Sequence, residues 1–379
     1  MAEEWKCPRC GYINPPFSRI CSNCGAERPG LWRCENGHMN LPFAQFCTAC
    51  GKPRPPLETS TKAKEQDWLQ FKSHYVGKTV KVKLPGPSPT SLPPHVGKLT
   101  IHGYECRSIL GKTGLSATLL CVDSHGVSRV LKIPAQWFDS IILGRKMEKL
   151  SRFESMGRER QILMELMKEE HPCIVKLEEI FEARQDEPPA LVLEFCTGGS
   201  LADVLIKTGP LDPLTAASII VQIADALAFL HKKGYAHGDV KPENILFSGD
   251  KVPKLADFNS ARAIATASRS RVPLTPGYAA PEDVKTGRPS QKGDVWSLAL
   301  VLLEAVTGKP LFASPDFLPY EEELQAFREG KVKLPGTGDK ELDEILEQCL
   351  KVDPNERPDM DDFERMLIKY LTKRLLVAG

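Results

Sequence analysis

The spacing of hydrophobic and polar residues divides most of the chain into a strand-rich part and a helical part. From about Tyr104 onward, apolar runs typical of strands occur at ATLLCV, RVLKI and ALVLEF, and the amphipathic stretch SRFESMGRERQILMELM lies between them. Beyond Gly199 the strong periodic segments are helical, namely LTAASIIVQIADALAFLHKKG, DVWSLALVLLEAVTG, DKELDEILEQCLKV and DMDDFERMLIKYLTKRL. We therefore expect an α+β domain over residues 101–374, with a small strand-rich lobe followed by a helical lobe.

The first hundred residues follow neither pattern. Residues 1–52 are dense in Cys, Gly and Pro, whereas RPPLETSTKAKEQ is too poor in apolar residues to pack. PGPSPTSLPP then interrupts any regular element, because proline has no backbone donor. These features predict a small unit at 1–52 and a partly Pro-rich linker at 53–100. The stretch 67–84 either packs on the larger domain or only spaces it.

The overall charge and the N-terminal residues point to no nucleic-acid, membrane or secretory role. The 50 Lys and Arg residues balance 49 Asp and Glu residues, so the whole chain has no electrostatic attraction to nucleic acid or membranes. MAEEWKCPRC has no signal-peptide features, and no apolar run looks long enough to cross a bilayer. We expect a cytoplasmic protein that does not bind membranes.

Cysteines are concentrated near the N-terminus. Seven of the twelve fall between Cys7 and Cys50, and in a reducing compartment such a cluster favours metal binding over disulfides. The other five are expected to be small buried hydrophobic residues: Cys106, Cys121, Cys173, Cys196 and Cys349.

Two sets of zinc ligands are predicted in this cluster. Paired Cys-x2-Cys turns, each followed by glycine, present four thiolates to one Zn²⁺. In the second set a histidine replaces the missing cysteine, and the irregular spacing makes that site weaker. The first set is Cys7, Cys10, Cys21 and Cys24, and the second is Cys34, His38, Cys47 and Cys50.

The repeated W-[KR]-C…N-x6-C-x2-C frame resembles double zinc ribbons and Ran-binding-protein-type zinc fingers. In the finger family, tryptophan and asparagine can serve RNA or ubiquitin recognition, and the matching positions are Trp5, Asn14, Trp32 and Asn40. In the alternative, zinc replaces a core too small to fold alone and the tryptophans cover the metal site. Up to Ser60, seven basic residues stand against five acidic ones, which favours a protein partner over RNA.

The strings YAHGDVKPENILF (235–247) and KLADFN (254–259) contain acids and an amide at fixed intervals, and they resemble the protein kinase family. The resemblance covers about 270 residues and implies a bilobal kinase-like fold, ATP, Mg²⁺ and a protein substrate with a Ser or Thr acceptor. Asp239 matches the catalytic-loop aspartate, while Asn244 and Asp257 match the metal ligands. Lys241 is the residue type that marks serine/threonine rather than tyrosine kinases.

The same resemblance assigns residues that hold the nucleotide. Lys132 ends a strand-like run and matches the lysine that neutralises the α- and β-phosphates. Its expected partner is Glu159, with Glu154 as the rival. The hinge is expected at Glu194-Phe195-Cys196, with adenine against Leu193 and neighbouring backbone groups. Three further residues are expected to be structural: Glu282 and Arg357 as an ion pair, and Asp294 as a brace of the catalytic loop.

Four positions depart from the family pattern. ILGKTGLSAT keeps Gly111 and Gly114, but Thr113 and Ser116 replace the second and third glycines of the phosphate-covering loop. Asn259 replaces the glycine of D-F-G, and we expect it to adopt a positive φ, which asparagine tolerates. Gly238 replaces the usual arginine of H-R-D. No catalytic residue is lost, so an ATP-dependent serine/threonine kinase is favoured over a pseudokinase scaffold or an RNA-binding zinc protein with an inactive kinase-like domain.

Overall fold

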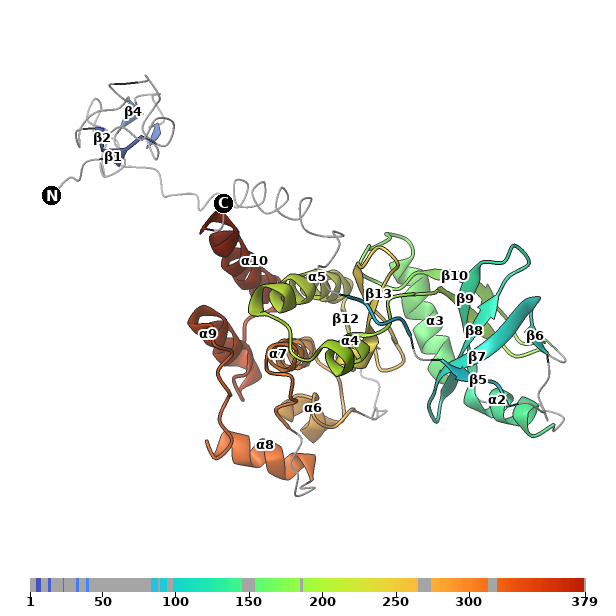
Figure 1. The fold of residues 1–379 in the computed structure, drawn as a ribbon. Helices are drawn as coiled ribbons and strands as arrows, with labels where there is room; N and C mark the ends of the chain where they lie inside the picture. The colour runs from blue at the N-terminus through green and yellow to red at the C-terminus, as the bar shows by residue number, and fades with distance from the viewer. Residues whose placement is uncertain are drawn as a thin grey trace. The chain divides into compact units, whose positions relative to one another are not determined.

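The computed structural model divides the chain into two compact units, Met1–Ser73 and His74–Gly379, and each is described by itself (Figure 1). It describes residues 83–87, 89–93, 98–144, 154–184, 187–264, 274–312 and 319–377, with short pieces between residues 5 and 40.

The repeat in the first unit forms two antiparallel hairpins. β1 (Trp5–Lys6) pairs with β2 (Ile13–Asn14), and β3 (Trp32–Arg33) pairs with β4 (Met39–Asn40). Trp5 is paired with Asn14, and Trp32 is paired with Asn40. The two copies therefore share their register as well as their sequence.

A seven-stranded antiparallel sheet makes up the small lobe. Its strands are β5 (Thr90–Ser91), β6 (Leu99–Ile101), β7 (Tyr104–Lys112), β8 (Ser116–Val122), β9 (Ser128–Pro134), β10 (Leu177–Phe181) and β11 (Ala190–Glu194). The order is β10-β11-β9-β8-β7-β5, and β6 also pairs with β7. The predicted strand runs all lie in this sheet. β5 and most of β6 lie within the segment expected as a linker.

Two helices belong to the small lobe. α3 (Glu154–Leu166) lies within the predicted amphipathic stretch and presents Leu163 and Leu166 to the interior. α2 (Ala135–Ile142) was not predicted, because its eight residues give too short a pattern. It buries Trp137 and Phe138, and Phe138 packs into the core cluster of the sheet.

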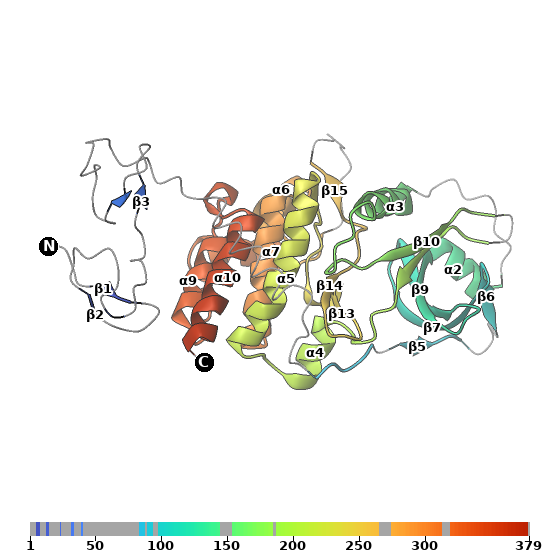
Figure 2. The same ribbon diagram turned by 90° about the horizontal axis from the view of Figure 1, so that it is seen from above.

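The helical lobe follows the predicted order of helices. It contains α4 (Leu201–Thr208), α5 (Pro213–Lys232), α6 (Pro281–Thr286), α7 (Gln291–Thr307), α8 (Tyr320–Arg328), α9 (Lys340–Cys349) and α10 (Met360–Val377). α7 and α10 both pack against α5 (Figure 2). Asp212 caps α5 by accepting from the Thr215 backbone N–H, and Ser290 caps α7 in the same way through Gly293. These caps explain where the two core helices begin.

The apolarity of α5 corrects one expectation. By length and composition α5 could cross a membrane, with a mean hydropathy of 1.7, although no run of that kind was predicted. Within the described part of the chain, 72% of this window is buried. A core helix that is apolar on most of its surface gives the same pattern, so the run is explained by packing.

Two short two-stranded sheets bring the functional loops together. β12 (Tyr235–Ala236) pairs with β15 (Arg262–Ala263), and β13 (Ile245–Phe247) pairs with β14 (Pro253–Leu255). The loop from β12 to β13, which includes the 3₁₀ turn η2 (Pro242–Asn244), therefore lies beside the loop from β14 to β15. A second 3₁₀ turn, η3 (Pro354–Glu356), precedes α10.

Two of the scattered cysteines are not separate thiols. Cys106 and Cys121 are paired residues on β7 and β8, and a disulfide joins them. They are 15 residues apart in sequence, and the register of two neighbouring strands brings them together. Cys173, Cys196 and Cys349 are buried, as expected.

Candidate active site

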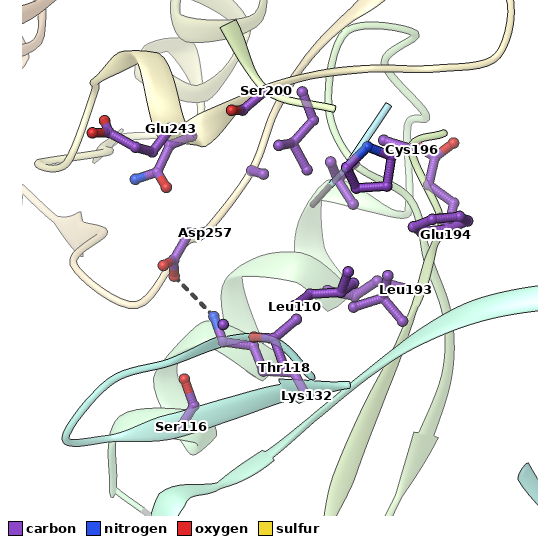
Figure 3. A pocket seen from close by; sticks show the side chains of 18 of the residues that line it. Leu110, Ser116, Thr118, Lys132, Leu193, Glu194, Cys196, Ser200, Glu243 and Asp257 are labelled. Carbon is purple, nitrogen blue, oxygen red and sulfur yellow. Dashed lines mark hydrogen bonds and ion pairs between the residues drawn. The ribbon is translucent and has the colours of Figure 1, made fainter. Parts of the chain in front are cut away.

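A cavity of about 380 Å³ lies between the sheet and the helical lobe, and it collects most of the predicted site residues. Figure 3 shows Lys132 and Asp257 at one end of the cavity and Glu194 and Cys196 at the other. Of the predicted nucleotide-binding positions, Gly114 is not part of the lining. The predicted residues that line it are Gly111, Thr113, Ser116, Lys132, Glu159, Glu194, Cys196, Asn244 and Asp257.

Lys132 is held between two carboxylates. Its Nζ lies 2.7 Å from Glu159 Oε1 and 2.8 Å from Asp257 Oδ1. β9 supplies the lysine and α3 supplies Glu159, so this contact joins the helix to the sheet. Glu159 therefore makes the predicted ion pair. The side chain of Glu154, the rival, lies outside the described side chains.

Burial and charge oppose each other in this cluster. Burial disfavours the charge on Lys132, but the carboxylates of Glu159 and Asp257 outweigh it and raise the pKa of Lys132 above its ordinary value. Burial would likewise raise the pKa of Asp257, but the adjacent ammonium lowers it. Both groups are therefore charged at neutral pH. The pKa of Glu159 is raised because that carboxyl is almost completely buried.

The phosphate-covering loop is closed by a side chain where the family has glycine. Thr113 Oγ1 accepts from the backbone N–H of Leu115, at 3.2 Å, and of Ser116, at 3.1 Å. The Thr113 N–H also donates to the Ser116 carbonyl at 2.9 Å. These bonds form a hydroxyl-stabilised turn, so the loop keeps a tight shape without the missing glycine.

Ser116 and Asn259 occupy two glycine positions of the family pattern, and they contact each other. Asn259 Nδ2 donates to Ser116 Oγ at 3.4 Å, while its Oδ1 is buried and has no hydrogen-bond partner among the described residues. A weak polar contact therefore links the phosphate-covering loop to the D-F-N loop. Neither glycine would have a side chain to make it.

The expectation of a positive φ at Asn259 is wrong. Among the described non-glycine residues, positive φ occurs at His102, Lys251 and Asp257, and Asp257 has a φ of 63°. The turn is made two residues earlier, where the Asp257 carboxylate accepts from the Asn259 N–H at 3.3 Å. Aspartate tolerates this conformation because its short polar side chain bonds locally.

The catalytic-loop residues form a compact hydrogen-bonded group beside the cavity. Asn244 Nδ2 donates to Asp239 Oδ2 at 2.8 Å and to the Asp239 carbonyl at 2.7 Å. Lys241 Nζ lies 3.0 Å from Asp239 Oδ1 and donates to Thr275 Oγ1 at 2.9 Å. Thr275 in turn donates to the same Asp239 oxygen. The carboxylate of Asp239 is thus held by three side chains.

Buried groups brace this loop from behind. Asp294 of α7 accepts from the backbone N–H of His237 and of Gly238, both at 2.8 Å, as the sequence predicts for a brace. The ring Nε2 of His237 donates to the backbone carbonyl of Ala256, in the neighbouring loop, at 3.1 Å. Burial lowers the pKa of His237. A neutral imidazole therefore ties the two functional loops together.

The expected ion pair at the end of the activation segment is formed. The guanidinium of Arg357 binds Glu282 through two nitrogens, at 2.7 and 2.8 Å. This bidentate geometry is the strong form of such a pair, and the arginine is almost fully buried. It anchors α6 to the start of α10.

The hinge end of the cavity is largely apolar. Leu110 and Val130 line it from the sheet, and Leu246 lines it from the helical lobe. The carboxylate of Glu194 bonds to Lys254 Nζ and to the Lys176 N–H, both at 2.7 Å. What Glu194 offers an adenine ring is therefore its backbone. Burial raises the pKa of the Cys196 thiol to about 12, so it stays neutral.

The donor set is compatible with Mg²⁺ held jointly with phosphate oxygens. Asp257 is a charged carboxylate, and the Asn244 side chain bonds to Asp239 through its nitrogen, so the Asn244 amide oxygen is the atom that could bind a cation. Hard oxygen donors of this kind suit Mg²⁺, which commonly takes one or two carboxylates and completes its shell with phosphates and water. Within the described residues, no group of three or more His, Cys, Asp or Glu residues forms a metal site by itself.

The zinc predictions fall almost entirely outside the described residues. Cys7 is described and is buried. The other seven predicted ligands lie outside the described part of the chain: Cys10, Cys21, Cys24, Cys34, His38, Cys47 and Cys50.

Sequence reasoning missed two kinds of site residue. Thr275, which holds Asp239, stands seven residues before Glu282, and a hydroxyl at that distance upstream of A-P-E was the available signal. Val130 and Leu246 carry no chemical signal, because apolar residues of the cavity look like any other core residue.

Comparison with known proteins agrees with this geometry. The family model "Protein kinase domain" matches residues 127–367, which is more than half of the chain, and the model "Zn-finger in Ran binding protein and others" matches residues 2–30. The chain is 36% identical over 217 residues to the serine/threonine-protein kinase PkaA of Streptomyces coelicolor, covering 55% of this chain and 38% of that one.

Two further relatives come from other organisms. The chain is 35% identical over 196 residues to human serine/threonine-protein kinase ULK3, covering 51% of this chain and 41% of that one. It is 36% identical over 140 residues to the serine/threonine-protein kinase PknL of Mycobacterium tuberculosis, covering 36% and 35%. The chain thus spans well under half the length of these curated relatives. On the match of the family model, the chain belongs to the protein kinase family.

Proposed function

We propose that this chain transfers the γ-phosphoryl group of ATP to a serine or threonine hydroxyl of a protein substrate. The observation that carries the proposal is the meeting of two clusters at one cavity. Lys132, Glu159 and Asp257 line the cavity and form the first cluster. The second cluster is Asn244, which also lines the cavity, and Asp239, which accepts a hydrogen bond from Asn244. Phosphoryl transfer requires positioning and charge neutralisation, and these clusters supply both.

The proposed step needs little covalent chemistry from the protein. The substrate hydroxyl oxygen bonds to the γ-phosphorus while the bond to the β,γ-bridging oxygen breaks, and ADP leaves. Asp239 orients the hydroxyl and accepts its proton, and Lys132 neutralises charge on the α- and β-phosphates. Bound Mg²⁺ would neutralise further phosphate charge, and Asp257 and Asn244 are the residues that would hold it.

A serine/threonine acceptor is favoured by the contacts of Lys241 and Thr275. Both side chains bond to Asp239, the residue proposed to orient the substrate hydroxyl. The three relatives described above, from three organisms, are all named serine/threonine-protein kinases, which supports the same acceptor.

The proposal is tested with the full chain, radiolabelled ATP, Mg²⁺ and a generic basic protein, followed by mapping of the modified residues. Label on serine or threonine is expected, and Asp239→Asn serves as the matched inactive control. A pseudokinase scaffold would bind ATP but give no more label than the control, and that result would refute the proposed activity.

For the N-terminal unit we propose zinc binding and recruitment of a protein partner. The match of residues 2–30 to a zinc-finger family and the even charge of this region support the proposal. We predict two Zn²⁺ per chain, with the second lost to chelators first because its ligand spacing is irregular. Elemental analysis of the purified chain measures the stoichiometry, and one ion or none would contradict the prediction. Tight binding of single-stranded RNA by the full chain would favour RNA as the partner.

A further inference from the structure

The segment just before the small lobe reaches the nucleotide cavity at Pro87. In both ribbon views the described residues 83–87 lead from α4 of the helical lobe toward β5 of the sheet (Figures 1 and 2). Four of these residues, from Leu84 to Pro87, are partly buried, within the segment expected as a partly Pro-rich linker. We call the described residues 84–87 and 89–91 the strap.

The strap is anchored to the helical lobe by close packing on two glycines. A Cβ built on Gly198 would lie only 2.5 Å from Leu84 Cδ1, so the leucine side chain occupies the space that a larger residue would fill. A Cβ on Gly199 would lie 2.6 Å from the carbonyl oxygen of Gly86. Lys207 of α4 adds a hydrogen bond to the Pro85 carbonyl at 3.2 Å. The surface of the helical lobe is therefore shaped to receive this segment.

The other end of the strap is part of the small lobe. Thr90 pairs with Ile109 and Ser91 pairs with Ser108, so β5 extends the edge of the sheet beside β7. The following residue, Leu92, packs against the core cluster of the sheet. The strap thus joins the two lobes by a second route, in addition to the hinge.

Between these anchors the strap enters the lining of the cavity through Pro87. The preceding residue, Gly86, lies against the hinge region, because a Cβ built there would be 3.6 Å from the Thr197 carbonyl oxygen. Figure 3 shows that the hinge residues Glu194 and Cys196 lie at the opposite end from Lys132 and Asp257. Pro87 therefore lies at the base end of the cavity, away from the phosphate end.

We propose that the strap closes the hinge end of the nucleotide cavity and that Pro87 positions the base of the bound nucleotide. This inference rests on the proposed use of ATP by the cavity. A proline with a fixed φ, on a segment tied down at both ends, presents a rigid apolar surface at little entropic cost on binding. The strap contributes to affinity through the nucleoside part and leaves the phosphate contacts unchanged.

The test measures binding to the full-length chain by calorimetry with three probes: adenosine, Mg²⁺–ATP and inorganic triphosphate. Leu84→Ala removes the anchor on Gly198, and Pro87→Gly removes the rigid contact. Each is expected to raise Kd for adenosine and for ATP by the same factor, about threefold to tenfold, and to leave triphosphate binding unchanged. Lys83→Ala is the matched control, because Lys83 is exposed and precedes the strap.

Different outcomes separate this inference from the proposed function. If the unaltered chain binds adenosine and both strap variants bind it equally well, the strap proposal is wrong while nucleotide use stands. A change confined to triphosphate would also overturn it. No nucleotide binding by the unaltered chain would overturn both.

A second measurement does not depend on the variants folding. In the unaltered chain, saturating adenosine is expected to slow hydrogen exchange at the backbone amides of Leu84 and Gly86, because closing the cavity holds the strap against the hinge. Unchanged exchange at these amides, together with slowed exchange at the hinge, would overturn the strap proposal.

Discussion

The phosphate-covering loop and the catalytic loop depart from the kinase pattern in opposite directions. The first has lost glycines, at Thr113 and Ser116, while the second has gained one, at Gly238. In the first loop, side-chain hydroxyls make the turn that glycine otherwise allows. In the second, φ at Gly238 is +75°, and a Cβ would lie 2.5 Å from Pro289 Cγ. Backbone conformation and the space around the Cβ position therefore decide where glycine is required.

The largest expected effect is the loss of phosphoryl transfer when a catalytic-loop or phosphate-binding residue is replaced. Asp239→Asn should lower kcat by about 10²–10⁴-fold, because it removes the proton acceptor while keeping the shape of the side chain. Lys132→Ala should also abolish transfer, through loss of the charge between Glu159 and Asp257. Initial rates with radiolabelled ATP measure both. Asp250→Asn, on an exposed turn, is the control, and wild-type turnover by either active-site variant would contradict the assignment.

The next prediction tests the gained glycine directly. Gly238→Ala should destabilise the chain by about 1–3 kcal/mol, because alanine is strained at this φ and its Cβ meets Pro289. Gly114→Ala is the matched change in the phosphate-covering loop, where no atom lies within 4 Å of the added Cβ and φ is not positive. Thermal or denaturant unfolding should show a loss for the first variant alone. Equal stability of the two variants would remove the contrast between the loops.

A smaller effect is expected from the contact between Ser116 and Asn259. Restoring glycine at both positions in a double-mutant cycle should give a coupling energy of about 0.5–1 kcal/mol, measured from the free energy of unfolding. The sign should favour the native pair, since each single change leaves a polar group without its partner. Ser116→Gly combined with Gln325→Ala, at an exposed position, should be additive. Additivity in both cycles would show that the two substituted positions act independently.

The last prediction concerns a third glycine that is required by its surroundings, and its effect appears as a dependence of stability on pH. A Cβ on Gly293 would lie 1.9 Å from Asp283 Oδ2, and this carboxyl is buried with its other oxygen unpartnered. Burial, with the nearby charges of Glu282 and Asp294, raises the pKa of Asp283 to about 8. Since the unfolded chain ionises this group from about pH 4 upward, its contribution to stability is lost as pH rises from about 4 to 8.

Asp283→Asn should therefore flatten the fall of unfolding free energy over this pH range, because asparagine does not titrate. Denaturant unfolding at several pH values measures the slope, and Asp250→Asn is the exposed control. An unchanged slope in the Asp283 variant would show that this carboxyl ionises normally in the folded chain.

The sequence by itself determined the order of the lobes and most of the chemistry. Its strand and helix periods reflect which face of each element is buried, and that is a local property. Asp239, Asn244 and Asp257 were found because phosphoryl transfer needs these residue types and because they lie close together in the sequence. The pairing of β12 with β15 and of β13 with β14 also brings their loops together in space. Gly114, by contrast, was predicted to bind the nucleotide but lies outside the cavity lining.

Tertiary structure alone decided the features that depend on contacts between distant residues. The Cys106–Cys121 disulfide follows from strand register, and the contact of Thr275 with Asp239 spans 36 positions. The positive φ at Asp257, where the sequence favoured Asn259, depends on how Lys132 and the loop hold that carboxylate. Leu84 and Pro87 read as linker because their partners, Gly198 and the hinge, lie more than a hundred residues away. Local pattern carries no information about such partners, because the energy of these contacts appears only once the lobes have packed.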